Sequence, residues 1–131
     1  MSRPEAERAR TFLERADADL AAVRALEASR EVPDEIVGFH AQQCAEKLLK
    51  AVLAGHQIEF PRTHSIQFLL DLLSDHGRAP PAALNAVREL YPYAVQFRYD
   101  APLDEAPLDR PKTRELLEQL SAWTTAQLPR A

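Results

Sequence analysis

The sequence predicts an all-α helical bundle, and three observations support this fold class. Apolar residues recur every three or four positions through most of the chain, which is the spacing of one buried helix face. Valine and isoleucine form no alternating runs bounded by turn residues, so strands have little support. Most of the prolines fall between the periodic segments, where a missing N–H is tolerated. We expect a single domain over residues 1–131, because this length can bury its own core.

Five helices are expected, separated mainly by prolines. Their expected ranges are 4–28, 33–54, 63–76, 81–100 and 111–128. Short links between the first three favour antiparallel neighbours, and hence an antiparallel bundle of four to five helices. The third helix is expected to be capped by Thr63 and to end at Gly77, which are residue types common at these two positions.

The fourth segment contains a proline inside its helical pattern. Its expected core positions are spaced by three or four residues: Leu84, Val87, Tyr91, Ala94 and Val95. Pro92 lacks a backbone N–H and is therefore expected to kink this helix. The polar residues that follow the kink make it a candidate functional feature, although a bend that only fits the bundle explains it equally well.

Composition excludes several classes of protein. Hydrophobic residues make up 46% and charged residues 27%, which is typical of a soluble globular domain. A net charge of −4 argues against a broad basic surface for duplex nucleic acid. No apolar run approaches the roughly 20 residues that cross a bilayer, and the N-terminal residues lack the apolar segment of a signal peptide. We expect a cytoplasmic protein with no membrane partner.

Motifs for metal or nucleophilic chemistry are absent from the sequence. The four histidines and Cys44 show none of the paired spacings of metal sites, apart from His40 and Cys44 at i, i+4. Cys44 is expected on a core face, where burial makes a thiol inert. Three glycines are too few for a phosphate-binding loop or a nucleophile elbow. We therefore expect no metal and no cofactor.

The second expected helix carries an unusual number of polar side chains. Opposite its apolar face, four of them share a stripe about 80° wide at 100° per residue: His40, Gln43, Lys47 and Lys50. Glu46 lies beside the stripe, where it can pair with Lys50 at i, i+4. Periodicity alone favours a solvated face with an ordinary ion pair, and a functional surface is the alternative.

Three motifs, in this order, resemble the HEPN domain family, named for higher eukaryotes and prokaryotes nucleotide-binding. They are FHAQQCAEKLLKAVL at 39–53, PRTHSIQFLLDLL at 61–73 and ELYPYAVQFRYD at 89–100. The resemblance covers nearly the whole chain and implies a bundle of four to five helices. It also implies a homodimer with nucleotide- or RNA-binding residues at its cleft. Many small bacterial members pair with a minimal nucleotidyltransferase, several of them as toxin–antitoxin systems.

The resemblance also implies which residues would bind a nucleotide or RNA. They are His40, Gln43, Glu46, Lys47, Lys50, His64, Arg98, Tyr99 and Asp100. Catalytic members cleave RNA without a metal, using an arginine followed after four to six residues by a histidine. In this chain the corresponding positions after Arg98 hold Leu103, Asp104 and Glu105, and no histidine follows His76.

Three functions stay open at this point. The first is a dimeric nucleotide- or RNA-binding module, non-catalytic or weakly catalytic, that acts with a nucleotidyltransferase partner. The second is a metal-independent ribonuclease toxin in which Arg98 stabilises phosphate charge and a non-standard histidine such as His40 transfers a proton. The third is a protein-docking domain whose polar stripe binds only a protein. The missing histidine favours the first function.

Overall fold

The computed structural model describes residues 3–94 and 107–129, which form five helices and no strand. The helices are α1 (Arg3–Leu26), α2 (Asp34–Gly55), α3 (Ile66–Asp75), η1 (Ala82–Tyr93) and α4 (Arg110–Gln127). The predicted all-α fold class is therefore confirmed. Within the two described ranges, no helix has both the length and the apolar character needed to cross a membrane.

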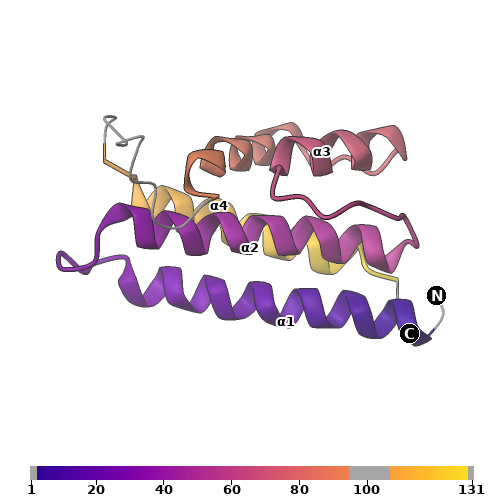
Figure 1. Ribbon diagram of the computed structural model, residues 1–131, viewed down its shortest axis with the longest axis horizontal. Helices are drawn as coiled ribbons and strands as arrows, with labels where there is room; N and C mark the ends of the chain where they lie inside the picture. Colours follow the sequence, from indigo (N-terminus) through magenta and orange to yellow (C-terminus); the bar gives the residue numbers. More distant parts are fainter. Residues whose placement is uncertain (1–2, 95–106, 130–131) are drawn as a thin grey trace.

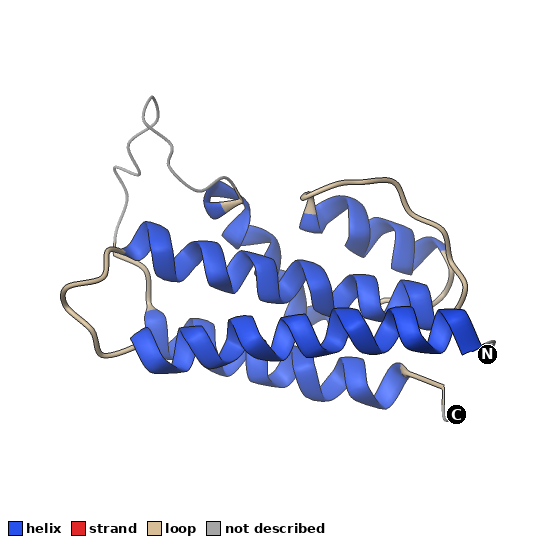
Figure 2. Cartoon of the chain, turned by 60° about the horizontal axis from the view of Figure 1, so that its bottom comes forward, coloured by secondary structure: helices blue, strands red, loops and turns tan. Residues whose placement is uncertain are grey.

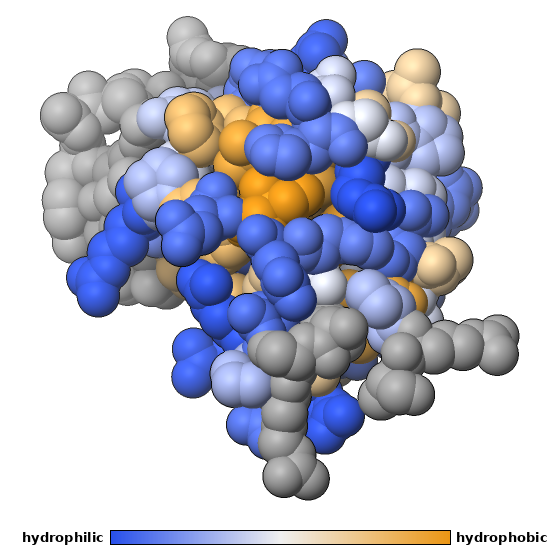
Figure 3. Space-filling model, turned by 90° about the vertical axis from the view of Figure 1, so that its right-hand side faces the viewer, coloured by the Kyte–Doolittle hydropathy of each residue, from blue (hydrophilic) through white to orange (hydrophobic). Residues whose placement is uncertain are grey.

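Helix α2 is the centre of the bundle and packs against the four other helices. Figure 1 shows α1 running antiparallel to α2 on one side, with α3 and η1 on the other side. α1 begins where α2 and α4 end (Figures 1 and 2). Seen from that end, the surface is mostly hydrophilic around a small apolar centre (Figure 3). Because neighbours surround it, α2 buries most of its circumference, including Leu48, Leu49, Val52 and Leu53.

The connection between α2 and α3 runs back along α2 (Figure 1). After Gly55 the helix ends, and Gln57 adopts a left-handed backbone with φ of 60°. The N–H of Ile58 then donates to the carbonyl of Leu53 at 2.9 Å, as in a Schellman motif. The chain returns over α2, so α3 points in the same direction as α2, although the short link predicted an antiparallel neighbour. This return places His64 over the middle of α2.

Helix α3 begins at Ile66 because Ser65 caps it. The Oγ of Ser65 accepts the N–H of Phe68 at 3.1 Å. The predicted cap, Thr63, was wrong: its Oγ1 accepts the N–H of Ser65 within the preceding loop, at 3.0 Å. Gly77 follows the end of α3 with φ of 69°, as its residue type predicted.

The fourth segment is a 3-10 helix and not the expected α-helix kinked at Pro92. Its three buried residues have a constant spacing of three, the period of a 3-10 helix: Leu84, Val87 and Leu90. Tyr91, an expected core residue, is 51% exposed, and Leu90 takes its place in the core. Pro92 lies inside this helix, one residue before its end. The expected continuation to residue 100 lies outside the described residues.

Arg110 joins three segments at the end of the bundle where α1 ends and α2 begins. Its Nε donates to Oδ1 of Asp34 at 3.0 Å, and the other oxygen of this carboxylate accepts the N–H of Leu108 at 2.9 Å. Its guanidinium also donates, at 2.7 to 2.9 Å, to the carbonyl oxygens of Leu26, Ser29 and Val32. The start of α4 is thereby fixed to the start of α2 and to the α1–α2 connection.

Gly38 allows the ring of Tyr93 to approach the backbone of α2. A Cβ at this position would lie 2.3 Å from Cδ1 of Tyr93, well inside van der Waals contact. Gly38→Ala is therefore expected to lower the free energy of unfolding by about 1–3 kcal/mol through overpacking. Urea denaturation measures this change. Adding Tyr93→Ala should make the alanine at position 38 harmless, and a single variant as stable as the parent would contradict the close packing.

Candidate functional site

Asp19 of α1 organises one polar cluster on α2, which we call the Asp19 cluster. Its Oδ1 lies 3.1 Å from Nδ1 of His40, and its Oδ2 lies 2.8 Å from Nζ of Lys47. A carboxylate only accepts hydrogen bonds, so His40 donates through Nδ1. Its Nε2 has no partner in the part of the chain that the structure describes.

Glu46 organises a second cluster one turn further along α2, which we call the Glu46 cluster. Its Oε1 accepts from Nδ1 of His64 at 2.8 Å, and its Oε2 accepts from Nζ of Lys50 at 3.3 Å. The pair of Glu46 and Lys50 predicted from the sequence is therefore confirmed. The side chain of Glu46 is 4% exposed, whereas that of His64 is 67% exposed. A buried carboxylate thus holds an imidazole that projects into solvent.

Sequence reasoning missed Asp19 and also Gln42, which contacts the backbone of His64 in the Glu46 cluster. Asp19 lies within the apolar stripe of α1, between the buried Ala16 and Val23, and a charge in such a stripe was an available signal. Gln42 is fully buried, and its Nε2 donates to the carbonyl of His64 at 2.8 Å. Its Oε1 has no hydrogen-bond partner among the described residues. Gln42 precedes Glu46 by four residues, which puts both on the same helix face.

The structure divides the predicted binding residues between the two clusters. His40 and Lys47 belong to the Asp19 cluster, and the Glu46 cluster contains Lys50 and His64. Gln43 is partly buried on α2 and enters neither cluster. The remaining predicted residues lie outside the described residues: Arg98, Tyr99 and Asp100. The stripe on α2 is therefore a set of paired charges rather than a freely solvated face.

Phe60 extends the Glu46 cluster towards α1. The Nζ of Lys50 lies 5.9 Å from the centroid of its ring, and the Cζ of Arg8 lies 4.9 Å from the same centroid. The ring of Phe12 packs against Phe60 with centroids 6.0 Å apart. Arg8 is exposed and makes no hydrogen bond or ion pair with any described residue. One aromatic ring therefore contacts two cationic side chains.

Cys44 is a core residue, as the sequence predicted. It is fully buried, and this burial, followed by the negative charge of Asp19, raises the pKa of its thiol to about 12. The thiol stays protonated near neutral pH and is therefore a poor nucleophile and metal ligand. Residues 3–94 and 107–129 contain no group of three or more His, Cys, Asp or Glu side chains that could hold a metal ion.

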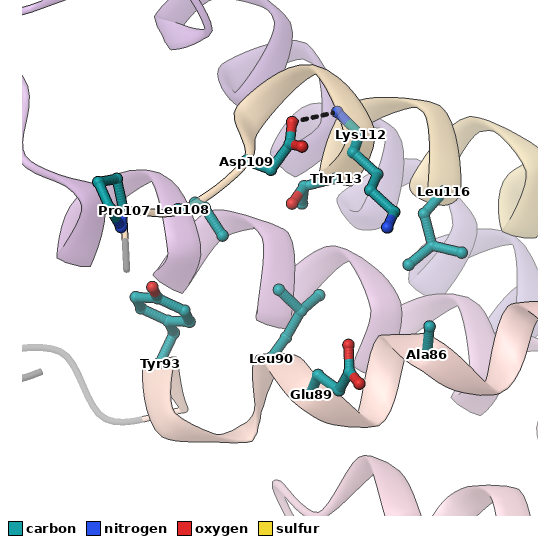
Figure 4. Close-up of a pocket in the computed structure, with 10 residues that line it drawn as sticks. All are labelled: Ala86, Glu89, Leu90, Tyr93, Pro107, Leu108, Asp109, Lys112, Thr113 and Leu116. Atoms are coloured by element: carbon teal, nitrogen blue, oxygen red, sulfur yellow. Dashed lines mark hydrogen bonds between the residues drawn. The ribbon is translucent and has the colours of Figure 1, made fainter. Parts of the chain in front are cut away.

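A cavity of about 490 Å³ lies between η1 and α4, away from both clusters. In Figure 4, Lys112 and Leu116 point from α4 towards η1, and Leu90 and Glu89 lie opposite them. The cavity shares no residue with the Asp19 cluster or the Glu46 cluster. Its lining is mostly apolar, and none of the predicted binding residues that the structure describes lines it.

The fold and the clusters define an all-α domain with two histidine–carboxylate–lysine clusters on its central helix. The HEPN domain model matches residues 9–125, and the chain belongs to the HEPN domain family. The crystal structure of an archaeal HEPN homologue is similar over 98% of this chain and 100% of its own, with 24% identity and a TM-score of 0.66. This similarity shows a shared fold. No curated protein shows significant similarity to the chain.

Proposed function

We propose that this chain is a nucleotide- or RNA-binding HEPN module that is non-catalytic or weakly catalytic. Family membership across residues 9–125 supports a nucleotide- or RNA-related role. The observation that carries the proposal is the presence of two basic side chains on each carboxylate of the α2 clusters. Each cluster is neutral when its imidazole is neutral and gains a positive charge when the imidazole is protonated. With its imidazole protonated, each cluster suits a phosphate group.

The clusters retain donors for a ligand after their internal contacts are made. A lysine ammonium has three N–H groups, and Lys47 and Lys50 each donate one to a carboxylate. His40 and His64 each use only Nδ1, so Nε2 is a further donor when the imidazole is protonated. In the proposal, Arg98 adds a further phosphate contact. Tyr99, next to it in the sequence, stacks on a base.

The proposal is tested by calorimetric titration with ATP and with a short single-stranded RNA. We expect binding by the parent protein and about tenfold weaker binding by Lys47→Ala, because a charge-assisted hydrogen bond is lost. Lys112→Ala is the matched control, since Lys112 is the one lysine outside the clusters. No heat with either ligand would contradict the proposal. A stable complex with a nucleotidyltransferase, in the absence of any heat, would support a protein-docking domain instead.

The proposal includes a homodimer that acts with a nucleotidyltransferase, as one half of a toxin–antitoxin pair. Its support is the family resemblance, in which small members commonly have such partners. Light scattering on the purified chain reports the dimer. Co-purification with a nucleotidyltransferase encoded beside this chain reports the partner, and a monomer that binds no such protein would contradict this part.

Ribonuclease activity is the second candidate, and one arrangement favours it. Glu46 orients the ring of His64 through Nδ1, as a carboxylate orients a catalytic base. The lack of a histidine after Arg98 weighs against it. Incubation with labelled RNA separates the candidates. Cleavage that disappears in Arg98→Ala and in His64→Asn or His40→Asn would make the nuclease the better assignment.

A further inference from the structure

We infer that Arg8, together with Lys50 and His64, forms a phosphate-binding patch beside Phe60. The inference rests on the proposed function and deepens it, because it names where a phosphate group binds. Arg8 belongs to α1 and was not among the residues that the family motifs indicated. The patch also lies apart from the Asp19 cluster, with which it shares no residue.

Arg8 is held in a geometry that leaves its donors available. Its Cζ lies 4.9 Å from the ring centroid of Phe60 and 5.7 Å from that of Phe12, so two rings restrict the guanidinium. These ring contacts use none of the N–H groups in a hydrogen bond with a described residue, so the donors remain available. Glu5, one turn earlier, forms no ion pair with Arg8. An exposed arginine ordered in this way loses little entropy when it binds a phosphate.

Lys50 and His64 complete the patch from the side of α2. Lys50 contacts the same ring as Arg8 and the same carboxylate as His64, so the three basic residues form one continuous series. The side chain of Lys50 is only 12% exposed and adds positive charge from the interior side of the patch. The side chain of His64 is mostly exposed and presents Nε2 to solvent. Glu46 neutralises only one of the two permanent charges. The patch is therefore net positive on a chain with a net charge of −4.

The geometry fits a phosphate group better than a carboxylate. A guanidinium edge and a protonated imidazole both donate hydrogen bonds, and a phosphate group offers them more acceptor oxygens than a carboxylate does. A free nucleotide and an RNA backbone both carry this group. The aromatic ring is already covered by Arg8 and Phe12, so we assign no base stacking to Phe60.

The test compares Arg8→Ala with Arg10→Ala. Both arginines are exposed on α1, and the second lies two residues further on, about 200° around the helix. Fluorescence anisotropy measures binding of a labelled short single-stranded RNA, and calorimetry measures binding of ATP. We expect Arg8→Ala to bind about tenfold more weakly than the parent. The slope of log K against log salt for RNA should also fall by about 0.7, as for the loss of one phosphate contact. Arg10→Ala should match the parent.

A second variant, His64→Asn, keeps a donor at the position of Nδ1 for Glu46 and removes the solvent-facing nitrogen. It should also weaken binding, with an unchanged melting temperature. Weaker binding of ATP, of RNA or of both by Arg8→Ala supports the patch. The ligand affected shows whether the phosphate group belongs to a free nucleotide or to an RNA backbone. Binding of Arg8→Ala equal to that of the parent would overturn the patch and leave the proposed function intact. No binding by the parent protein would overturn both.

Discussion

Replacing Arg110 by alanine is expected to lower the free energy of unfolding by about 3 kcal/mol, near the lower limit for breaking a buried ion pair. The side chain of Arg110 is only 14% exposed, and it donates to Asp34 and to three carbonyl oxygens. Alanine removes all of these donors, and the α1–α2 connection loses its link to α4. Guanidinium chloride denaturation followed by circular dichroism measures the change.

Two further variants control this prediction. Arg10→Ala removes an exposed arginine without an ion pair among the described residues, and it should change stability by less than about 0.5 kcal/mol. Arg110→Lys keeps the charge, but an ammonium group cannot reproduce a planar guanidinium that donates to Asp34 and to three carbonyl oxygens together. It should therefore recover only part of the loss. An Arg110→Ala protein as stable as the Arg10→Ala control would refute the role of this contact.

Replacing Glu46 by alanine is expected to cost about 3 kcal/mol of unfolding free energy, because the largely buried Lys50 is left without its carboxylate. His64 also loses the acceptor that fixes its ring, but this side chain is mostly exposed and contributes less. Thermal denaturation of the variant and the parent at the same pH measures the effect. No loss of stability would show that solvent already screens this pair.

A double variant separates the structural role of the Glu46 cluster from its binding role. Glu46→Leu combined with Lys50→Met replaces the pair by apolar side chains of similar size. Such replacements of buried ion pairs are often neutral or stabilising, so most of the stability should return. Binding of ATP and RNA should not return, because the patch has lost the positive charge of Lys50. A double variant that is stable and binds like the parent would limit Glu46 and Lys50 to a structural role.

The helices could be predicted where the apolar pattern of the segment itself determines the structure. α1, α2 and α4 have long apolar stripes, and their observed ends lie within two residues of the expected ones. The 3-10 segment was not predicted, because Tyr91 and Leu90 are both apolar and adjacent. Helical spacing of three or four permits either, and only packing against the core selects Leu90.

The candidate site was predictable only within one helix. Glu46 and Lys50 are four residues apart on α2, so their pairing follows from helix geometry. Asp19 is 21 residues from His40, and their contact depends on how α1 and α2 are aligned along their length. No local pattern specifies this alignment. Arg8 was missed for the same reason, since its aromatic partner Phe60 belongs to a distant connection.

The connection between α2 and α3 supplies one residue of the patch, and the two other residues lie on core helices. Arg8 and Lys50 stand on helices that share the core, whereas His64 is supplied by residues 56–65. Lengthening a loop by a few residues costs little stability. Insertions between Phe60 and His64 would therefore move the imidazole relative to Arg8 and Lys50, while the ring that both cations contact stays in place. Related chains could in this way acquire different ligand preferences while the bundle itself stays unchanged.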